Sequence, residues 1–360
     1  TPGSPALFKA WDDEVVKAAA PWYVPDYFDP ATGSFSTSIH SWLVKGPGFC
    51  ALVDLGCGNG KDRDPPMQAF GGLATDWPAR LEAAGARIED ITHVLFTHLH
   101  VDHVGWATVP DGRGGWTPTF PDALHVMTRI ERDHRDPERG AAGMSPARNA
   151  PFLDSVKPVL DQGRVDLVEG DETGYLPGID FIPAPGHAKG QMAIRFSGGG
   201  KTAICTADVM HQPIQVFRPD WASGFCEDKP LAEITRRRIL ALAADEGALV
   251  LPMHFGGTHA GHVRRAGDGA PLEGVRIQIW AHTTEGRERD PESHGATLTD
   301  ASGAFRMDMP QIVPAFGQPH AHLAYDADHD PNGFRTVFLR PVMSSRSDTS
   351  LSADFVLQPA

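Results

Sequence analysis

Short apolar runs recur between residues 50 and 254, and each ends in Gly, Pro, His or Asp. Five of them have the length and composition of buried strands: 50–56, 91–98, 179–187, 202–208 and 248–254. Stretches with a helical period lie at 77–87 and 230–247, the second with an apolar stripe at Leu231, Ile234, Ile239, Leu240 and Leu242. Strands that alternate with helices predict an α/β layered domain.

Metal-capable side chains end four of these five predicted strands. They are His98, His187, Asp208 and His254. Because the ends of neighbouring strands meet at the same border of a sheet, this pattern predicts that the four side chains gather along one edge of the sheet.

The pattern changes near residue 267, within the Gly-rich segment 266–274. Beyond it come short alternating runs separated by turn residues, without a helical period. This pattern is typical of a β-sandwich. We therefore expect two domains, an α/β domain at 1–267 and a smaller all-β domain at 268–360.

Composition narrows the classes of partner. Of the 360 residues, 41% are apolar and 22% are charged, which is ordinary for a soluble globular protein. The formal net charge of −14 argues against a nucleic-acid or anionic-membrane partner, since both need a basic surface. A small-molecule substrate is the expected partner, and a homo-oligomer stays open.

Location is predicted from absent signals. We find no apolar run long enough to cross a bilayer, and the first residues lack the basic and apolar blocks of a signal peptide. The four cysteines form no C-x-x-C pair, and Cys50 and Cys205 sit in apolar runs as small core residues do. We expect a reducing, cytoplasmic compartment, although a leader removed before residue 1 would leave no trace.

The densest chemical signal is a cluster of four metal-capable side chains in six positions: His98, His100, Asp102 and His103. Imidazole and carboxylate are the ligands that borderline cations such as zinc prefer. The spacing is too tight for one ion to take all four from one loop. We therefore assign His98 and His100 to one ion, and Asp102 and His103 to a second.

Each ion still needs ligands from elsewhere, and the matching strand ends supply His187, Asp208 and His254. A carboxylate between two cations can bridge them, and Asp208 is the candidate. Two neighbouring cations lower the pKa of a shared water and polarise the bond that it attacks. The sequence therefore predicts metal-assisted hydrolysis.

The run "THLHVDHVGW" (97–106), with "PGH", "TAD" and "MHF" downstream, resembles the metallo-β-lactamase superfamily over roughly residues 35–268. The resemblance implies an αββα sandwich with a dinuclear site. In this reading His98, His100 and His187 hold one ion, Asp102, His103 and His254 hold the other, and Asp208 lies between them. "LVDLGCGNGK", "PAPGHAKGQM" and "DVMHQPIQV" further resemble the branch of methyl parathion hydrolase-like enzymes and lactonases.

Fold alone does not determine the reaction, because this superfamily hosts hydrolases, redox enzymes and nucleases. Its quorum-quenching lactonases carry a Tyr three residues beyond the bridging Asp, where this chain has His211. His211 is our candidate donor to a developing oxyanion, and a purely supporting histidine is the alternative. Four aromatic residues are candidates for either an apolar pocket or the core: Trp106, Phe120, Trp221 and Phe225.

Two other segments imitate binding motifs. "GCGNGK" (56–61) lacks the spacer between its glycines and the Ser or Thr after Lys61 that a phosphate loop requires, so we interpret it as a turn. The acidic "FCEDKP" (225–230) is interpreted as the cap of the helix that follows it.

The tail has a resemblance of its own. "GDGAPLEGVRIQIWAH", "TLTDASGAFRMDM" and "QPHAHL" look like the catalytic domain of intradiol ring-cleavage dioxygenases, which hold iron with two Tyr and an H-x-H pair. His320 and His322 match the pair. Glu288 and Val313 stand where the tyrosines would fall, and Tyr325 follows the pair, so catechol dioxygenase activity is not expected.

Two hypotheses remain for the tail. The favoured one is a degenerate domain kept for packing, substrate guidance or oligomer contacts. The other is a rebuilt site, with iron as one candidate, that uses His320, His322 and either Glu288 or His294. An H-x-H pair on a strand is also common on ordinary surfaces.

The leading hypothesis from the sequence and its resemblance is a dinuclear zinc hydrolase that opens a lactone or cleaves a carboxylic ester, including an aryl ester. Asp102, Asp208 and His211 are the predicted catalytic residues. The tail favours a setting in aromatic catabolism. The alternatives are a phosphotriester hydrolase and a bifunctional protein with a second metal in the tail. Zinc follows mainly from the resemblance, since such sites also accept iron, manganese or cobalt.

Overall fold

The computed structural model describes residues 7–140, 145–256 and 259–264, together with the backbone of four strands nearer the C-terminus. The chain divides into two units, Thr1–Arg264 and Arg265–Ala360.

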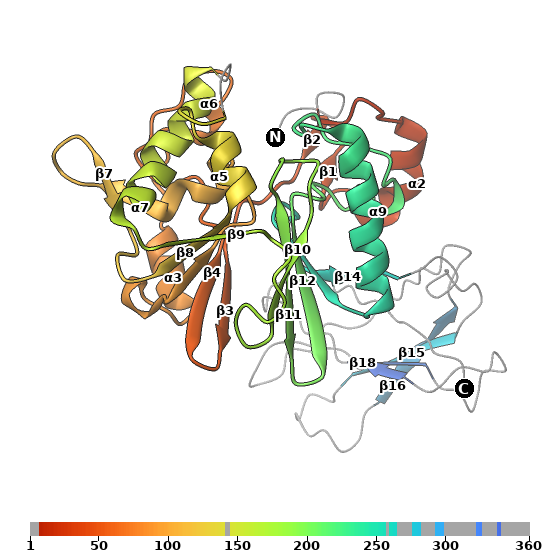
Figure 1. Cartoon of the computed structure of the whole chain (residues 1–360). Coiled ribbons are helices and arrows are strands. Elements are labelled where there is room, and N and C mark those ends of the chain that lie inside the picture. The colour runs from red at the N-terminus through yellow and green to blue at the C-terminus, as the bar shows by residue number, and fades with distance from the viewer. Residues whose placement is uncertain are drawn as a thin grey trace. The chain divides into compact units, whose positions relative to one another are not determined.

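The first unit contains two five-stranded sheets that face each other (Figure 1). The first sheet has the order β3-β4-β5-β8-β9, in which β3 and β4 form an antiparallel hairpin and the remaining pairs are parallel. Its strands are Trp42–Gly46 (β3), Phe49–Val53 (β4), His93–Leu95 (β5), Leu124–Thr128 (β8) and Val165–Val168 (β9).

The second sheet has the order β10-β11-β12-β13-β14, and only its β12–β13 pair is parallel. Its strands are Ile179–Pro183 (β10), Met192–Gly198 (β11), Lys201–Ala207 (β12), Leu249–Pro252 (β13) and Gly261–His262 (β14). At the end of β12 the register shifts and Ala207 adopts a positive φ of 51°. The chain therefore leaves the sheet at Asp208.

Helices and short elements connect and cover the sheets. The helices are Asp13–Tyr23 (α2), Trp77–Ala83 (α3), Val101–Val104 (α4), Arg129–Arg135 (α5), Pro146–Pro151 (α6), Lys157–Gln162 (α7), Ile214–Phe217 (α8) and Lys229–Asp245 (α9). The 3₁₀ and π turns are Gln68–Phe70 (η1), Ile88–Asp90 (η2), Gly105–Ala107 (η3) and Phe152–Val156 (η4). Two small ladders pair Phe28–Asp29 (β1) with Ser34–Phe35 (β2), and Thr108–Pro110 (β6) with Trp116–Pro118 (β7).

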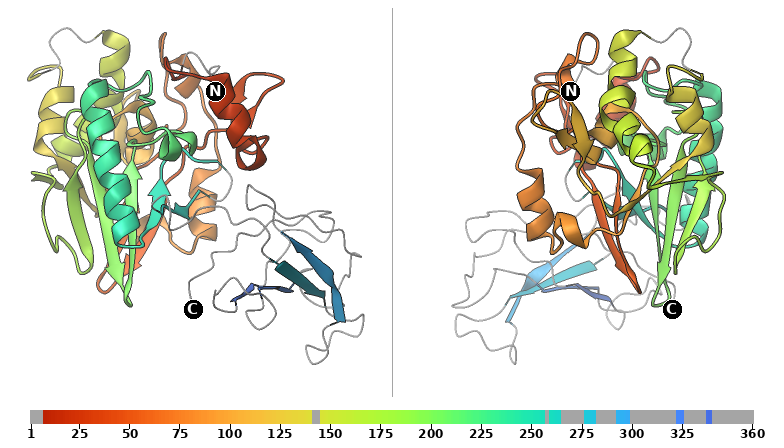
Figure 2. Two further views of the ribbon diagram at one scale, coloured as in Figure 1. Left: turned by 90° about the vertical axis from the view of Figure 1, so that its right-hand side faces the viewer. Right: turned by 60° about the vertical axis from the view of Figure 1, so that its left-hand side comes forward.

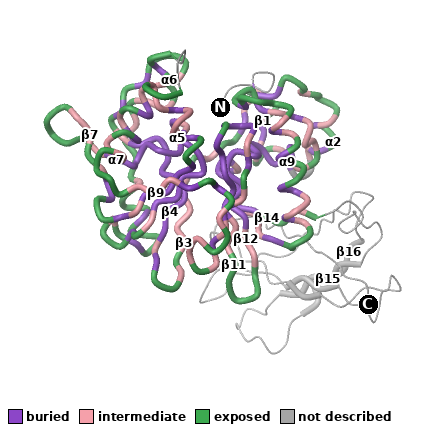
Figure 3. The backbone as a smooth tube through the Cα atoms, in the orientation of Figure 1, coloured by how far each residue is buried: buried purple, intermediate pink, exposed green. Residues whose placement is uncertain are grey.

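Buried residues lie along the strands of both sheets, as Figure 3 shows. Because side chains alternate along each strand, they divide this buried core into layers. On β4, Ala51 and Val53 point between the sheets, while Leu52 points outward to the helices. On β12, Cys205 points between the sheets and Ile204 packs with α9. Figure 2 shows α9 along the side of the second sheet that faces away from the first. The layers are therefore helix, sheet, sheet and helix.

Much of the predicted element pattern is confirmed. All five predicted runs contain strands, and both predicted helical stretches contain helices, α3 and α9. The expectation of one sheet edge is wrong, because β5 belongs to one sheet and β10, β12 and β13 belong to the other. The predicted metal ligands therefore come from two sheets.

The predicted apolar stripe of α9 is partly wrong. Ile239 and Leu240 are buried, but Ile234 is 63% exposed. In its place the helix buries Arg236, whose Nε and Nη1 donate to the carbonyl oxygens of Val209 (2.7 Å) and Pro219 (2.5 Å). The buried face of α9 therefore differs from the one that hydrophobicity alone predicts, because carbonyl oxygens of a neighbouring loop accept hydrogen bonds from Arg236.

The predicted turn at 56–61 ends in a lysine that is already engaged. Lys61 Nζ donates to Thr108 Oγ1 at 2.8 Å and lies 3.6 Å from the ring centre of Trp116, and the residue is 1% exposed. All four cysteines are free thiols, and Cys205 is fully buried as expected. Within the described part of the chain, no helix combines the length and apolar character needed to span a bilayer.

The described strands of the second unit form one antiparallel sheet in the order β16-β15-β17-β18, which are Glu292–Leu298, Arg276–Ala281, His322–Tyr325 and Val337–Leu339. The all-β sandwich stays a prediction. His294 lies on β16, and His322 and Tyr325 lie on β17. The other tail positions singled out in the sequence lie outside the described residues: Glu288, Val313 and His320.

A glycine behind α4 gives the first prediction. A Cβ on Gly105 would lie 1.8 Å from the carbonyl carbon of Cys57, although its backbone is helical (φ −59°, ψ −45°) and would suit Ala. We expect Gly105→Ala to lower the free energy of unfolding by at least about 2 kcal/mol. Denaturant unfolding measures this, with Gly198→Ala, which meets open space, as the control. Equal stability of the two variants would contradict the close approach.

A second prediction concerns His125, a fully buried imidazole on β8. Burial lowers the pKa of His125 from 6.5 to about 4. The unfolded chain binds this proton more tightly than the folded chain does. The contribution of neutral His125 to the free energy of unfolding is therefore fully present above pH 6.5 and is lost as the pH falls toward 4. At pH 5 the loss is about 2 kcal/mol.

The measurement is denaturant unfolding at pH 7.5 and pH 5 for the natural protein and for His125→Leu. The variant lacks this proton linkage, so it should lose about 2 kcal/mol less between the two pH values. The same pH dependence in both proteins would show that His125 does not titrate in this way.

Candidate metal centre

The predicted ligands lie at the ends of strands from both sheets. His98 and His100 occupy the loop after β5, and Asp102 and His103 lie on α4, which follows at once. The remaining three leave the second sheet: His187 follows β10, Asp208 follows β12 and His254 follows β13. Two sheets that face each other thus bring distant segments to one place.

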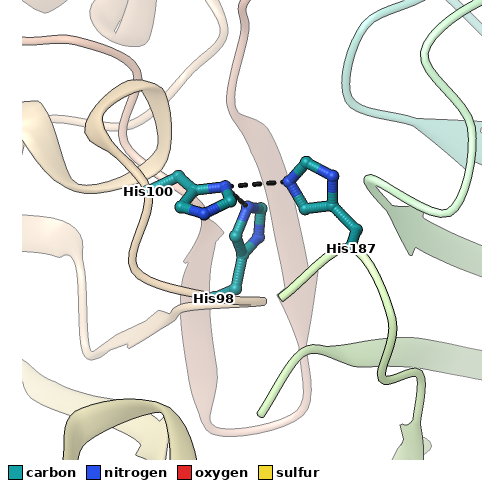
Figure 4. A group of neighbouring side chains, drawn as sticks. All are labelled: His98, His100 and His187. Carbon is teal, nitrogen blue, oxygen red and sulfur yellow. Dashed lines mark hydrogen bonds between the residues drawn. The ribbon is translucent and has the colours of Figure 1, made fainter. Parts of the chain in front are cut away.

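Three histidines form the first donor group, as Figure 4 shows. Nδ1 of His100 lies 3.0 Å from Nε2 of His98 and 2.8 Å from Nε2 of His187. The rings of His98 and His187 are almost completely buried, whereas the side chain of His100 is 22% exposed. One nitrogen from each ring faces a common point, which is the arrangement that a borderline cation requires.

Asp102, His103 and His254 form the second donor group. Oxygens of Asp102 lie 3.7 Å from Nε2 of His103 and 3.7 Å from Nε2 of His254. The Nδ1 atom of His254 contacts the carbonyl oxygen of Ser38 at 3.0 Å, so its Nε2 faces inward. This group offers two nitrogens and one carboxylate.

Asp208 lies between the two groups. Its Oδ2 is 3.2 Å from Nε2 of His187 and 3.0 Å from Nε2 of His254, and its Oδ1 is 3.3 Å from Nε2 of His103. The residue is only 3% exposed. One carboxylate therefore touches ligands of both groups, which is the position of the bridge expected from the sequence.

The electrostatics of the two groups differ. Burial lowers the pKa of His98 and of His187 well below the usual value, so these rings are neutral. Burial would also lower the pKa of His103, but the carboxylates of Asp208, Asp54 and Asp102 raise it well above the usual value. The second group thus has a strongly negative surrounding, which favours a cation.

The donor set fits a divalent transition metal. Nε2 of His103 and Oδ1 of Asp208 are buried and 3.3 Å apart, but neither has a partner of regular hydrogen-bond geometry among the described residues. Buried polar atoms without partners are rare in proteins unless a ligand or an ion uses them. Four candidate groups have three donors each within 4.8 Å of one another, and three of these groups combine imidazole with carboxylate, as zinc sites do.

One supporting residue was missed by the sequence analysis. Asp54, fully buried, accepts from the backbone N–H of Thr97 (2.8 Å) and from its hydroxyl (2.7 Å), and its Oδ2 is 2.8 Å from Nδ1 of His103. A carboxylate that takes the outer N–H of a ligand histidine fixes the ring and its tautomer. The signal in the sequence was an acidic residue directly after a buried strand.

His211 lies at the centre, as its position near Asp208 suggested. Its ring is parallel to that of His254 (centroids 5.4 Å apart, interplanar angle 7°), and its Nε2 is 3.4 Å from Oδ2 of Asp208. Within the described residues, neither ring nitrogen has a partner of regular hydrogen-bond geometry. Burial lowers the pKa of His211, so the ring is a neutral imidazole with one N–H to donate.

The four candidate aromatic residues separate into two classes. Trp106, Phe120 and Trp221 are buried in core clusters, so their packing role is confirmed. Phe225 is 52% exposed, and its ring centre lies 5.9 Å from that of His211. Of the four, Phe225 alone presents an apolar surface beside the donor groups.

The acidic segment 225–230 has two functions. Asp228 caps α9, since its side chain accepts from the backbone N–H of Leu231 at 3.0 Å, as the sequence analysis expected. The preceding residues Cys226 and Glu227 instead reach the first donor group. The Sγ atom of Cys226 lies 3.9 Å from Nδ1 of His187.

A family model described as the metallo-beta-lactamase superfamily matches residues 37–254, more than half of the chain. This chain belongs to the metallo-beta-lactamase superfamily. The matched residues include both donor groups and Asp208. The chain is therefore a metal-dependent hydrolase of this superfamily, whose fold implies a divalent metal, commonly zinc, and the His and Asp groups described above are the candidate ligands. No curated protein matches the chain.

Solved structures of the same superfamily fold resemble the first unit. The hydrolase AbOPH, described as a member of the beta lactamase superfamily, is 25% identical, with a TM-score of 0.59 over 73% of this chain and 86% of its own. A probable metal-dependent hydrolase from Staphylococcus aureus is 20% identical, with a TM-score of 0.57 over 70% and 84%.

A third structure is AidC, described as a dizinc quorum-quenching lactonase in complex with a product. It is 24% identical, with a TM-score of 0.52 over 64% of this chain and 76% of its own. At these identities the last two likenesses show the shared fold and not a shared substrate.

The contact between Asp54 and His103 gives the third prediction. In Asp54→Asn, one oxygen becomes an amide donor that cannot accept from His103, so we expect zinc affinity to fall by roughly 10- to 100-fold. Asn tolerates the positive φ of 52° at this position, so the fold should persist. Chelator competition measures the affinity. Asp111→Asn, on the surface, is the control, and equal affinities in the two variants would remove Asp54 from the site.

Proposed function

We propose that this chain is a dinuclear zinc hydrolase that opens a lactone or cleaves a carboxylic ester. The observation that carries the proposal is the convergence of two donor groups on either side of Asp208. His98, His100 and His187 would hold one ion, and Asp102, His103 and His254 the other. A divalent cation in such a site acts as a Lewis acid and makes water a nucleophile near neutral pH.

Asp208 would bridge the two sites and orient the nucleophile. Burial alone would raise the pKa of Asp208, but the imidazoles of His254, His103 and His187 hold it well below its ordinary value. The group is therefore a carboxylate across the working pH range. Asp102 would contribute a second negative charge beside His103 and His254. These fixed charges are in place before a substrate arrives, which is the condition for electrostatic catalysis.

His211 would donate a hydrogen bond to the oxygen of the carbonyl as negative charge develops on it. Its neutral ring keeps one N–H, which no described residue accepts in regular hydrogen-bond geometry, although Oδ2 of Asp208 lies 3.4 Å from its Nε2. Removing one such donor typically lowers kcat by about 100- to 1000-fold. Phe225, exposed beside His211, would contact an apolar part of the substrate.

A carbonyl substrate suits this geometry because a single donor next to the bridge matches a single developing oxyanion. Lactones are also the substrate class in the description of AidC, which has the same fold. A phosphotriester, as in methyl parathion hydrolase-like enzymes, is the alternative, since the same ions could polarise a phosphoryl oxygen. The tail would guide substrates or assemble subunits, and the setting in aromatic catabolism rests on its resemblance alone.

The fourth prediction tests the reaction class. Zinc-loaded protein should hydrolyse members of a panel of aliphatic lactones and aryl esters faster than phosphotriesters. Asp208→Asn should lower kcat by at least about 1000-fold and weaken metal pairing, because the bridge loses its charge. Steady-state rates and metal content per chain are the measurements.

Each outcome of the panel has a definite meaning. Phosphotriester turnover above carbonyl turnover would favour the alternative substrate. Full activity and two ions per chain in Asp208→Asn would refute the proposed bridge. Lys17→Gln, which changes an exposed residue of α2, is the matched control for a single change of charge.

A further inference from the structure

Helix α5 carries a buried ion pair that contacts the first donor group. Glu131 and Arg135 lie one turn apart, and Nε of Arg135 donates to Oε1 of Glu131 at 2.8 Å. Their side chains are 1% and 8% exposed. Buried charges are unfavourable unless neighbouring groups compensate them. The groups that compensate Glu131 and Arg135 therefore show which segments this pair keeps in position.

The carboxylate of Glu131 holds two ligand-bearing loops. Its Oε2 accepts from the backbone N–H of Gly190 at 2.9 Å, three residues after His187. Its Oε1 accepts from the N–H of Leu99 at 3.5 Å, between His98 and His100. A Cβ on Gly190 would lie 2.4 Å from the backbone nitrogen of Glu131, so only glycine permits this approach.

Arg135 extends the contacts to a third loop. Its Nη2 donates to Oε1 of Glu227, and it lies 2.7 Å from Nε2 of His100. Glu227 is also 3.3 Å from Nε2 of His134, and its side chain is 28% exposed. The three charged residues Glu131, Arg135 and Glu227, here called the α5 network, therefore connect the loops at 97–100, 187–190 and 225–228.

The outer nitrogen of His100 decides whether this histidine can bind a metal. Its Nδ1 faces His98 and His187, so a ligand role needs Nδ1 without a proton and Nε2 with one. A guanidinium can only donate, so Arg135 alone would select the opposite tautomer. The carboxylate of Glu227 lies 4.0 Å from the same Nε2, which is beyond hydrogen-bond distance in this structure, and a small shift would make it an acceptor for the tautomer needed for binding.

We propose that the α5 network is a positioning device for the first ion. When the ion is bound, Glu227 would receive the N–H of His100, and Arg135 and Glu131 hold Glu227 and the ligand loops in place. The inference rests on the proposed assignment of His98, His100 and His187 to one ion. It adds three positioning residues to a site whose sequence motifs contain none of them. Mutation of such supporting groups typically lowers metal affinity by about 10- to 100-fold.

The fifth prediction uses full-length protein and zinc, with chelator competition to resolve the two dissociation constants. Glu227→Ala should raise the dissociation constant of one zinc ion by at least about 10-fold and change that of the other by less than about 2-fold. Glu227→Gln keeps a carbonyl acceptor and should lie between the natural protein and Glu227→Ala. Arg129→Ala is the control, since Arg129 lies on the same helix but pairs with Glu169 at the surface.

A second variant identifies the ion that is affected. His98→Ala removes a ligand of the first ion, so adding Glu227→Ala to it should not weaken the remaining ion further. A direct readout is the ¹⁵N spectrum of labelled histidines, in which the protonated ring nitrogen of His100 should move from Nε2 toward Nδ1 in Glu227→Ala.

The outcomes separate this inference from the proposed function. If His98→Ala leaves both dissociation constants unchanged, the proposed ligand assignment fails. If His98→Ala loses one ion but Glu227→Ala binds both as the natural protein does, only the α5 network is refuted. A lower thermal midpoint of Glu227→Ala in excess chelator, with both affinities intact, would also refute it, because it would show a purely structural ion pair.

Discussion

A single buried carboxylate, that of Asp208, organises the first unit. An isolated charge in a protein interior is strongly unfavourable, so it needs partners within contact distance. His187, His103 and His254 supply them, and they come from three different segments of the chain. The sandwich of two sheets is the scaffold that brings these segments together, because each segment leaves its sheet on the side where the sheets meet.

The strands and the donor residues could be predicted from sequence because both have local signals. A buried strand is a short apolar run, and His98, His187, Asp208 and His254 follow such runs directly. The grouping into two sheets was missed, since apolar runs do not state which neighbours they pair with. The end of an apolar run predicts that the next residue lies at the edge of a sheet. Only the pairing of the strands shows which sheet that is.

The supporting residues could not be assigned to the site from sequence, even though Asp54 directly follows a buried strand. Asp54, Glu131 and Arg135 act through segments that are distant along the chain, and each of their contacts depends on the completed fold. The rotation of α9 has the same origin, because Arg236 is satisfied by carbonyl oxygens of a loop that precedes the helix. Among the aromatic candidates, composition could not distinguish Phe225 from Trp221, since burial depends on what packs against each ring.

Ligands drawn from both sheets give the metal centre a mechanical consequence. Ions held as proposed would join the segment after β5, which includes α4, to the ends of β10, β12 and β13 in the other sheet. They would thus cross-link the two sheets, which the free cysteines of this chain do not do. An ion that binds the folded state but not the unfolded state stabilises the fold by mass action. The ions that take part in hydrolysis would then also stabilise the fold, so the supply of metal would govern both the rate of hydrolysis and the stability of the protein.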